Sequence, residues 1–211
     1  MISSDIVTVR SFSTFEREFP AVEVGPRTAP SARSQDRKDW WAVRRAAFAL
    51  YHAGMLAGAI RLRRIPETTI CSCPDFEFCC ELGFGTLEIT EATHPDDQRE
   101  MTTNESEAGP SVLGANGGRG KQGFPGDTPF QMIAADIIEA VNRKATKYDL
   151  SMRSSMILGI YVNSNPAIFL DTFDKLAPFL SANDLKHFGF RAIVAFKDRD
   201  EAYAIWKSTD E

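Results

Sequence analysis

The run MILGIYV, residues Met156–Val162, constrains the fold more than any other stretch of the sequence, because almost all of it is apolar. A strand with so few polar side chains has to be covered on both faces. The preceding segment, 128–150, predicts a long helix, since Thr128 can cap it, Pro129 suits its first turn and apolar residues recur with the helical period. A helix followed by a doubly covered strand is typical of an α/β fold.

The remaining elements are predicted from shorter patterns of apolar residues and from turn residues. We expect further helices over 36–59 and 168–180, and strands over 6–9, 68–73, 75–80, 86–92, 191–196 and 202–206. In the strand over 86–92 the residues alternate, so Glu88 and Thr90 point to one face and Leu87 and Ile89 to the other.

The length of 211 residues and the hydrophobic content of 43% suit one domain with a core of its own. We expect residues 1–35 to form an N-terminal arm, partly extended or flexible. Residues 36–211 would be a single α/β domain. It would contain a long flexible loop at about 94–128, where the sequence is polar and rich in glycine.

Charge is distributed unevenly along the chain, whose formal net charge is −5. Residues 65–110 hold one basic and eleven acidic side chains, whereas residues 1–64 are basic on balance. No apolar run approaches the roughly 18 residues that a membrane span requires. The N-terminus lacks the basic-then-apolar pattern of a secretory signal, so we expect a cytoplasmic location and no membrane partner.

Two carboxylates stand at corresponding places in neighbouring predicted strands. Asp75 opens one strand, and Glu88 lies in the next, across a short turn that contains Gly85. Adjacent strands are about 5 Å apart, so the two side chains can share one hard divalent cation. One or two carboxylates with waters and a phosphate oxygen are the usual ligands of Mg²⁺. The alternative is a pair of solvated strand carboxylates. Acidic residues are poor strand formers, so their presence within these strands favours the metal site over this alternative.

Pro74-Asp75, then a hairpin, then Glu88-Ile89-Thr90, resembles the motif of the PD-(D/E)XK nuclease superfamily. The core of that restriction-endonuclease-like fold runs helix, three strands, helix, strand, and the resemblance covers residues 36–162. It implies that Asp75 and Glu88 bind Mg²⁺, with Mn²⁺ as an alternative ion. It also implies that the backbone carbonyl of Ile89 is a further metal ligand. The C-terminal helix and strands would be additions to this core.

Thr90 stands where the family has its catalytic lysine, and some members of the superfamily carry that lysine on the following helix. Lys144 shares a helical ridge with Val141 and Tyr148, which puts it on or beside the apolar stripe, whereas Arg143 and Lys147 are expected to point further out. A lysine at the border of an apolar face needs a charged partner or a route to solvent. Lys144 therefore either belongs to the Asp75–Glu88 site or extends to solvent.

These residues favour a Mg²⁺-dependent nuclease that hydrolyses the phosphodiester bonds of DNA or RNA. Asp75, Glu88 and Lys144 would be its catalytic residues, and nucleic acid its substrate. The alternative is a protein of the same fold that has lost catalysis and acts as a binding or interaction module. An apolar face on the C-terminal elements is compatible with a homodimer.

Overall fold

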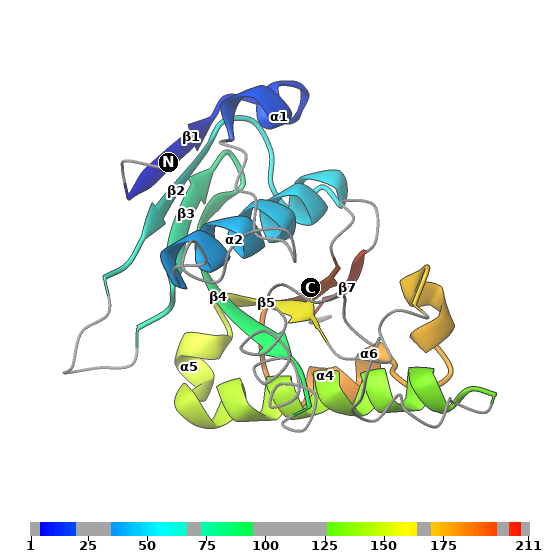
Figure 1. Ribbon diagram of the computed structural model, residues 1–211. Helices are drawn as coiled ribbons and strands as arrows, with labels where there is room; N and C mark the ends of the chain where they lie inside the picture. The colour runs from blue at the N-terminus through cyan, green and yellow to red at the C-terminus, as the bar shows by residue number, and fades with distance from the viewer. Residues whose placement is uncertain are drawn as a thin grey trace, which may run out of the picture.

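A seven-stranded open sheet forms the centre of the molecule, with its strands in chain order (Figure 1). The computed structural model describes residues 5–19, 35–66, 73–94, 126–163, 170–197 and 203–207, with only the backbone for residues 35–37. The strands are β1 Ile6–Val9, β2 Ile60–Arg64, β3 Phe76–Cys80, β4 Gly83–Ala92, β5 Met156–Val162, β6 Ala192–Phe196 and β7 Tyr203–Lys207. The described helices are α1 Phe15–Glu18, α2 Gln35–His52, α4 Thr128–Lys147, α5 Leu150–Arg153 and α6 Ala182–Lys186, with 3-10 turns at Phe12–Thr14 and Phe173–Leu176.

The strand directions divide the sheet into two parts. β1 to β4 form an antiparallel meander, β4, β5 and β6 are parallel, and β7 returns antiparallel. The parallel pair β4 and β5 is in register from Thr86 opposite Met156 to Ala92 opposite Val162. Parallel neighbours need a crossover connection, and α4 lies within the one that joins β4 to β5.

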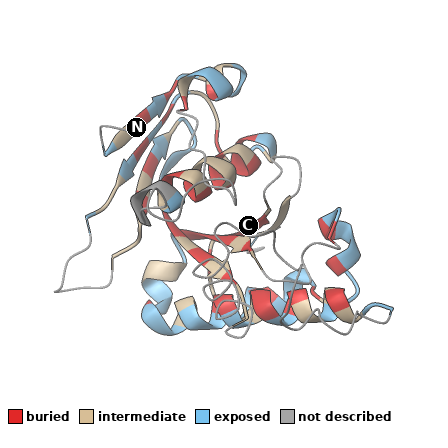
Figure 2. Cartoon of the chain, viewed as in Figure 1, coloured by how far each residue is buried: buried red, intermediate tan, exposed pale blue. Residues whose placement is uncertain are grey.

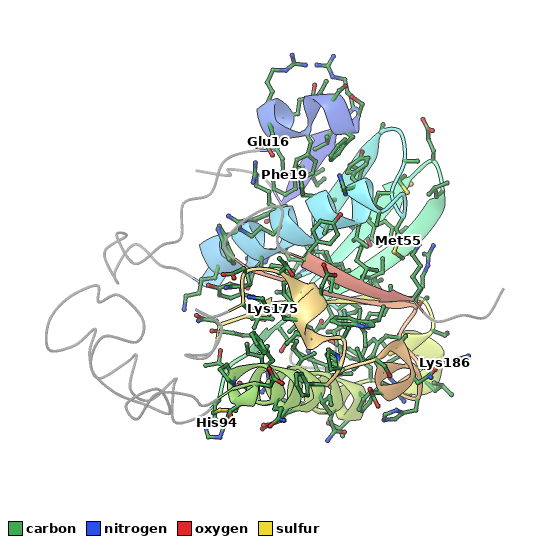
Figure 3. All side chains as sticks on the ribbon, turned by 90° about the vertical axis from the view of Figure 1, so that its right-hand side faces the viewer. Glu16, Phe19, Met55, His94, Lys175 and Lys186 are labelled. Carbon is green, nitrogen blue, oxygen red and sulfur yellow. The ribbon has the colours of Figure 1, made fainter. Side chains whose placement is uncertain are left out.

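Two hydrophobic layers cover the two faces of this sheet. α2 packs on one face through residues such as Trp40 and Leu50, and α4 packs on the other through Ile133 and Ile137 (Figure 1). Buried residues of α4 lie on its side toward the sheet and exposed ones on its outer side (Figure 2). Side chains fill the space between the helices and the sheet (Figure 3). Six of the seven residues of β5 are buried, which confirms the strand covered on both faces.

The structure confirms the mixed α/β class and several predicted elements. The strands over 6–9 and 156–162 have the predicted bounds, and the predicted strands at the C-terminal end appear as β6 and β7, shifted by one residue at some ends. The helix predicted from Thr128 begins at that residue and has proline at its start. Among the described residues, no helix combines the length and the apolar character needed to cross a membrane.

Three predicted helices differ from the structure in extent. The helix predicted over 36–59 ends at His52, because Gly54 has a φ angle of 70° that a helix cannot continue through. The chain then forms β2, which the sequence analysis missed because it is basic. The predicted helix over 168–180 appears, in its described part, only as the turn at Phe173–Leu176. α4 ends at Lys147 rather than at 150, since Tyr148 is extended at φ −120° and ψ 142°.

Some predictions fall largely outside the described residues. The strand expected over 68–73 has only Cys73 within them, and Cys73 is not in a strand. The loop at about 94–128 likewise lies mostly in 95–125, which the structure does not describe. Of the arm at 1–35, residues 5–19 form β1, a 3-10 turn and α1, with Phe15 and Phe19 buried. The domain division itself stays a prediction.

Candidate functional site

The candidate site lies where β3 and β4 separate. Pairing between these strands ends at Phe76 opposite Leu87, while β4 continues to Ala92 beside β5. Pro74 precedes the fork and has no amide hydrogen to continue the ladder. The Asp75 side chain connects the two strands beyond the end of their pairing: its carboxylate Oδ2 accepts a hydrogen bond from the Ile89 amide at 2.7 Å.

Glu88 is the most buried charged residue of the described chain, with 0% of it exposed. Its Oε1 lies 2.5 Å from the Nζ of Lys144 and 3.2 Å from the Nζ of Lys147. Its Oε2 accepts hydrogen bonds from the Tyr148 hydroxyl at 2.8 Å and from the Asp75 amide at 3.1 Å. A carboxylate can be buried in this way only with such partners, because losing its hydration is otherwise too costly.

The C-terminal end of α4 supplies the cations. Lys144 and Lys147 lie in its last turn, where positive charge also suits the helix dipole. The Lys144 side chain is 18% exposed and that of Lys147 37%, so Lys144 is the more enclosed. Both amines reach Glu88 because this end of the helix packs over the fork.

Tyr148, the residue that follows α4, also contacts the site. Its ring is buried, and its hydroxyl lies 2.9 Å from the Cys73 carbonyl as well as near Glu88. Burial raises the pKa of the Tyr148 phenol, and the hydrogen bond to the negative Glu88 raises it further. The phenol therefore stays protonated, and its one proton serves either the carboxylate or the carbonyl.

The Asp75 carboxyl is shifted toward its neutral form. Burial raises its pKa from 3.8 to about 6, with the negative charge of Glu88 as the next cause, while the Ile89 amide and Lys144 act in the opposite direction. Two acids beside each other in a poorly solvated place repel, so a bound proton or cation relieves them. Near neutral pH this pair has an electrostatic reason to take up a cation.

An acid of the first long helix also lies within electrostatic reach. Asp39 in α2 forms an ion pair with Arg64 at 2.7 Å, and its charge contributes to the raised pKa of Asp75. Arg64 is followed by Ile65, whose amide donates to the Asp75 carbonyl at 2.9 Å. Asp39 is therefore linked, through Arg64 and its neighbour Ile65, to the backbone of Asp75.

The structure brings Asp75, Glu88 and Lys144 together, so of the two alternatives left open for Lys144 it supports the one beside the acid pair. The roles of the three residues as metal ligands and catalytic lysine stay predictions. Ile89 contributes its amide to Asp75, whereas the expected role of its carbonyl as a metal ligand stays a prediction. Arg143 and Lys147 are exposed and Lys144 is half-buried, which confirms that the first two point further out. Even so, Lys147 reaches Glu88 and Arg143 reaches Thr90 at 3.0 Å, because long basic side chains can bend back toward the sheet.

Tyr148 was predicted only as a member of the apolar stripe of α4. Its place four residues after Lys144 was the available signal, since residues so spaced share one helix face. A buried tyrosine near a buried carboxylate is then a natural hydrogen-bond partner.

The donor set suits a hard divalent cation such as Mg²⁺ or Mn²⁺. Asp75 and Glu88 offer carboxylate oxygens, and the Ile89 carbonyl is a neighbouring backbone oxygen. No cluster of three or more His, Cys, Asp and Glu side chains is found in the described part of the chain. Magnesium commonly uses only one or two carboxylates and fills its other positions with water and phosphate oxygens.

Comparisons with protein-family models, with curated proteins and with solved structures found no match for this chain. Function is therefore inferred from the geometry of the residues described above.

Proposed function

We propose that this protein is a Mg²⁺-dependent nuclease that hydrolyses phosphodiester bonds in DNA or RNA. The observation that carries the proposal is the convergence at the β3–β4 fork. There a fully buried Glu88 lies against Asp75, with the Lys144 amine 2.5 Å from a Glu88 oxygen. An acid with a raised pKa, as Asp75 is, beside a buried acid that has a specific cationic partner is typical of catalytic sites.

The order of elements supports the same proposal. α2, β2, β3, β4, α4 and β5 come in the order helix, three strands, helix and strand, with the short helix α5 between α4 and β5. This order is the one expected for a PD-(D/E)XK nuclease core. In that core the two acids would come from the second and third strands; here Asp75 immediately precedes β3 and Glu88 lies in β4.

In the proposed site, Asp75, Glu88 and the Ile89 carbonyl would hold the ion. When bound, Mg²⁺ supplies Lewis-acid polarisation of a phosphoryl oxygen and a more acidic water. Lys144 would orient the attacking water or neutralise charge on the scissile phosphate. Tyr148 keeps the Glu88 carboxylate in one orientation through its hydroxyl.

Lys144 would also compensate for Thr90, which occupies the position of the family's lysine. Its amine approaches Glu88 from α4 rather than from β4, yet it ends beside the same carboxylate. A lysine that moves to a neighbouring element can keep its role if its amine reaches the same place, because only the position of the charge matters there.

A second candidate is a binding module that has the same fold without catalysis. The saturation of Glu88 favours it, because both carboxylate oxygens already accept hydrogen bonds from lysine, tyrosine and backbone donors. An ion would have to displace at least one of these donors. The two candidates differ in whether Glu88 exchanges such a donor for a metal.

The test is cleavage of end-labelled single-stranded and duplex DNA and RNA with Mg²⁺ or Mn²⁺. We expect the wild type to cleave at least one substrate, and Asp75→Asn, Glu88→Gln and Lys144→Met to lose most of the activity. Asp171→Asn is the control, since its side chain is 75% exposed and pairs with Lys175 away from the fork. Equal cleavage by all variants would indicate a contaminant, and no cleavage of any substrate would favour the binding module.

A further inference from the structure

Arg143 is a cation held in place by neutral groups. Its Nη2 donates to the Thr90 hydroxyl at 3.0 Å and to the Glu91 backbone carbonyl at 2.9 Å. The nearby Glu91 carboxylate is bound instead by the Thr93 hydroxyl at 2.9 Å and by the Asn163 side chain. Among the described residues Arg143 makes no ion pair, and the groups that orient its guanidinium there are neutral.

This guanidinium lies beside the proposed catalytic site. Thr90 follows Glu88 by two residues and faces the same side of β4, so the two residues are separated by about 6.7 Å along the strand. Arg143 also precedes Lys144 on α4 and is exposed to solvent. The exposed guanidinium therefore lies at the same end of α4 as the buried Glu88 and the half-buried Asp75.

The basic side chains at this end of α4 can take part in binding an anion. Arg143, Lys144 and Lys147 contribute three positive charges, which the carboxylates of Asp75, Glu88 and Glu91 balance. A divalent cation between Asp75 and Glu88 would leave a positive excess for an anion to balance. The free edge of an arginine matches two oxygens of a phosphate, and that paired contact is among the strongest hydrogen-bonded contacts in proteins.

We propose that Arg143, aimed by the Thr90 hydroxyl, forms a phosphate-binding subsite for a backbone phosphate of a nucleic-acid strand, next to the phosphate that is cleaved. The inference rests on the proposed function, since nucleic acid is the ligand. It also gives Thr90 a role, because a hydroxyl at this position accepts a hydrogen bond from the guanidinium, which a lysine could not do.

Arg143 is a binding residue in this account and not a catalytic base, since a guanidinium stays protonated. Its contribution should be independent of base sequence, because phosphates carry no sequence information. Its loss should weaken binding of the strand and reduce the salt dependence of that binding.

The experiment measures fluorescence anisotropy of labelled single-stranded and duplex DNA, about 12 nucleotides long. EDTA is present so that the strand stays intact. We expect Arg143→Gln to raise Kd by about tenfold, as for loss of one charge-assisted contact. The slope of log Kd against log salt should fall by about 0.7 for single strands and about 0.9 for duplex. Thr90→Val should weaken binding less and leave the slope unchanged.

Arg17→Gln is the matched control, because this arginine lies on α1 with a side chain that is 71% exposed. It should leave both Kd and the slope as in the wild type. Thermal unfolding of each variant excludes loss of the fold as the cause. The inference is overturned if the wild type binds neither strand, or if Arg143→Gln keeps the wild-type affinity and slope.

The proposed function fails separately from this inference. Binding that depends on Arg143 without any metal-dependent cleavage would sustain the subsite and reject the nuclease. Cleavage that depends on Asp75 and Glu88, combined with an Arg143→Gln variant that binds normally, would sustain the nuclease and reject the subsite.

Discussion

Replacing Asp75 by asparagine should make the metal-free protein more stable at neutral pH, although a hydrogen-bonded residue is altered. Asparagine keeps an oxygen that can accept the Ile89 amide, so the hydrogen bond at the fork survives. It removes the negative charge that burial and Glu88 disfavour. The charge repulsion within the acid pair is thereby relieved without opening the structure.

The size of the effect follows from the pKa of Asp75, which rises from 3.8 in a solvated carboxyl to about 6 in the folded protein. The folded state therefore binds more protons than the unfolded state between these values, and its stability falls as pH rises through this window. Each pKa unit corresponds to about 1.4 kcal/mol, so the ionised Asp75 costs up to about 3 kcal/mol above the window. This figure already includes the attraction to Lys144, which lowers the pKa of Asp75.

The assay is urea unfolding followed by tryptophan fluorescence in EDTA, with wild type and Asp75→Asn compared at about pH 4 and about pH 7.5. We expect the variant to gain stability at the higher pH and to match the wild type near the lower one. Asp149→Asn is a control of opposite sign, since hydrogen bonds from Ser151 and the Met152 amide lower the pKa of Asp149. A variant no more stable than wild type at the higher pH would refute the reasoning.

Two further substitutions test the packing of the site. Glu88→Gln should destabilise the fold by about 3 kcal/mol, because Lys144 and Lys147 lose their shared counter-charge. Denaturant titration at neutral pH measures this change in stability. An unchanged midpoint would show that the lysines do not depend on Glu88. Tyr148→Phe should cost about 1–3 kcal/mol, since the Glu88 oxygen and the Cys73 carbonyl lose a donor while the ring stays buried. Thermal unfolding checks the second change, and a Tm equal to wild type would mean that water replaces the hydroxyl.

The sequence predicted the parts of the fold that rest on strong local patterns. Met156–Val162 was recognised because a strand covered on both faces has to be apolar almost throughout, and seven residues are a typical strand length. β2 was missed because Arg61 and Arg63 alternate with buried Ile60 and Leu62, and the basic residues hid the alternation. The end of the first long helix was misplaced because a single glycine, Gly54, terminates it, and one glycine inside a helical pattern is a weak signal.

The site was predictable from strand spacing only to the level of its acids and one lysine. Asp75 and Glu88 follow from the hairpin between them, and Lys144 from the helical ridge it shares with Val141 and Tyr148. The contacts of Lys147 were not predictable, because they depend on how the end of α4 packs on β4. A helix pattern gives the direction of a side chain at its base but not the reach of a long basic one.

The most direct test of the central claim is calorimetric titration of Mn²⁺ into the wild type, Asp75→Asn and Glu88→Gln at about pH 7.5, above the pKa of Asp75. If Asp75 and Glu88 share one cation, the wild type binds a single Mn²⁺ per chain, and each variant loses at least about tenfold in affinity, or about 1.4 kcal/mol. A wild type that binds no Mn²⁺, or variants that bind it as tightly as the wild type, would contradict the claim.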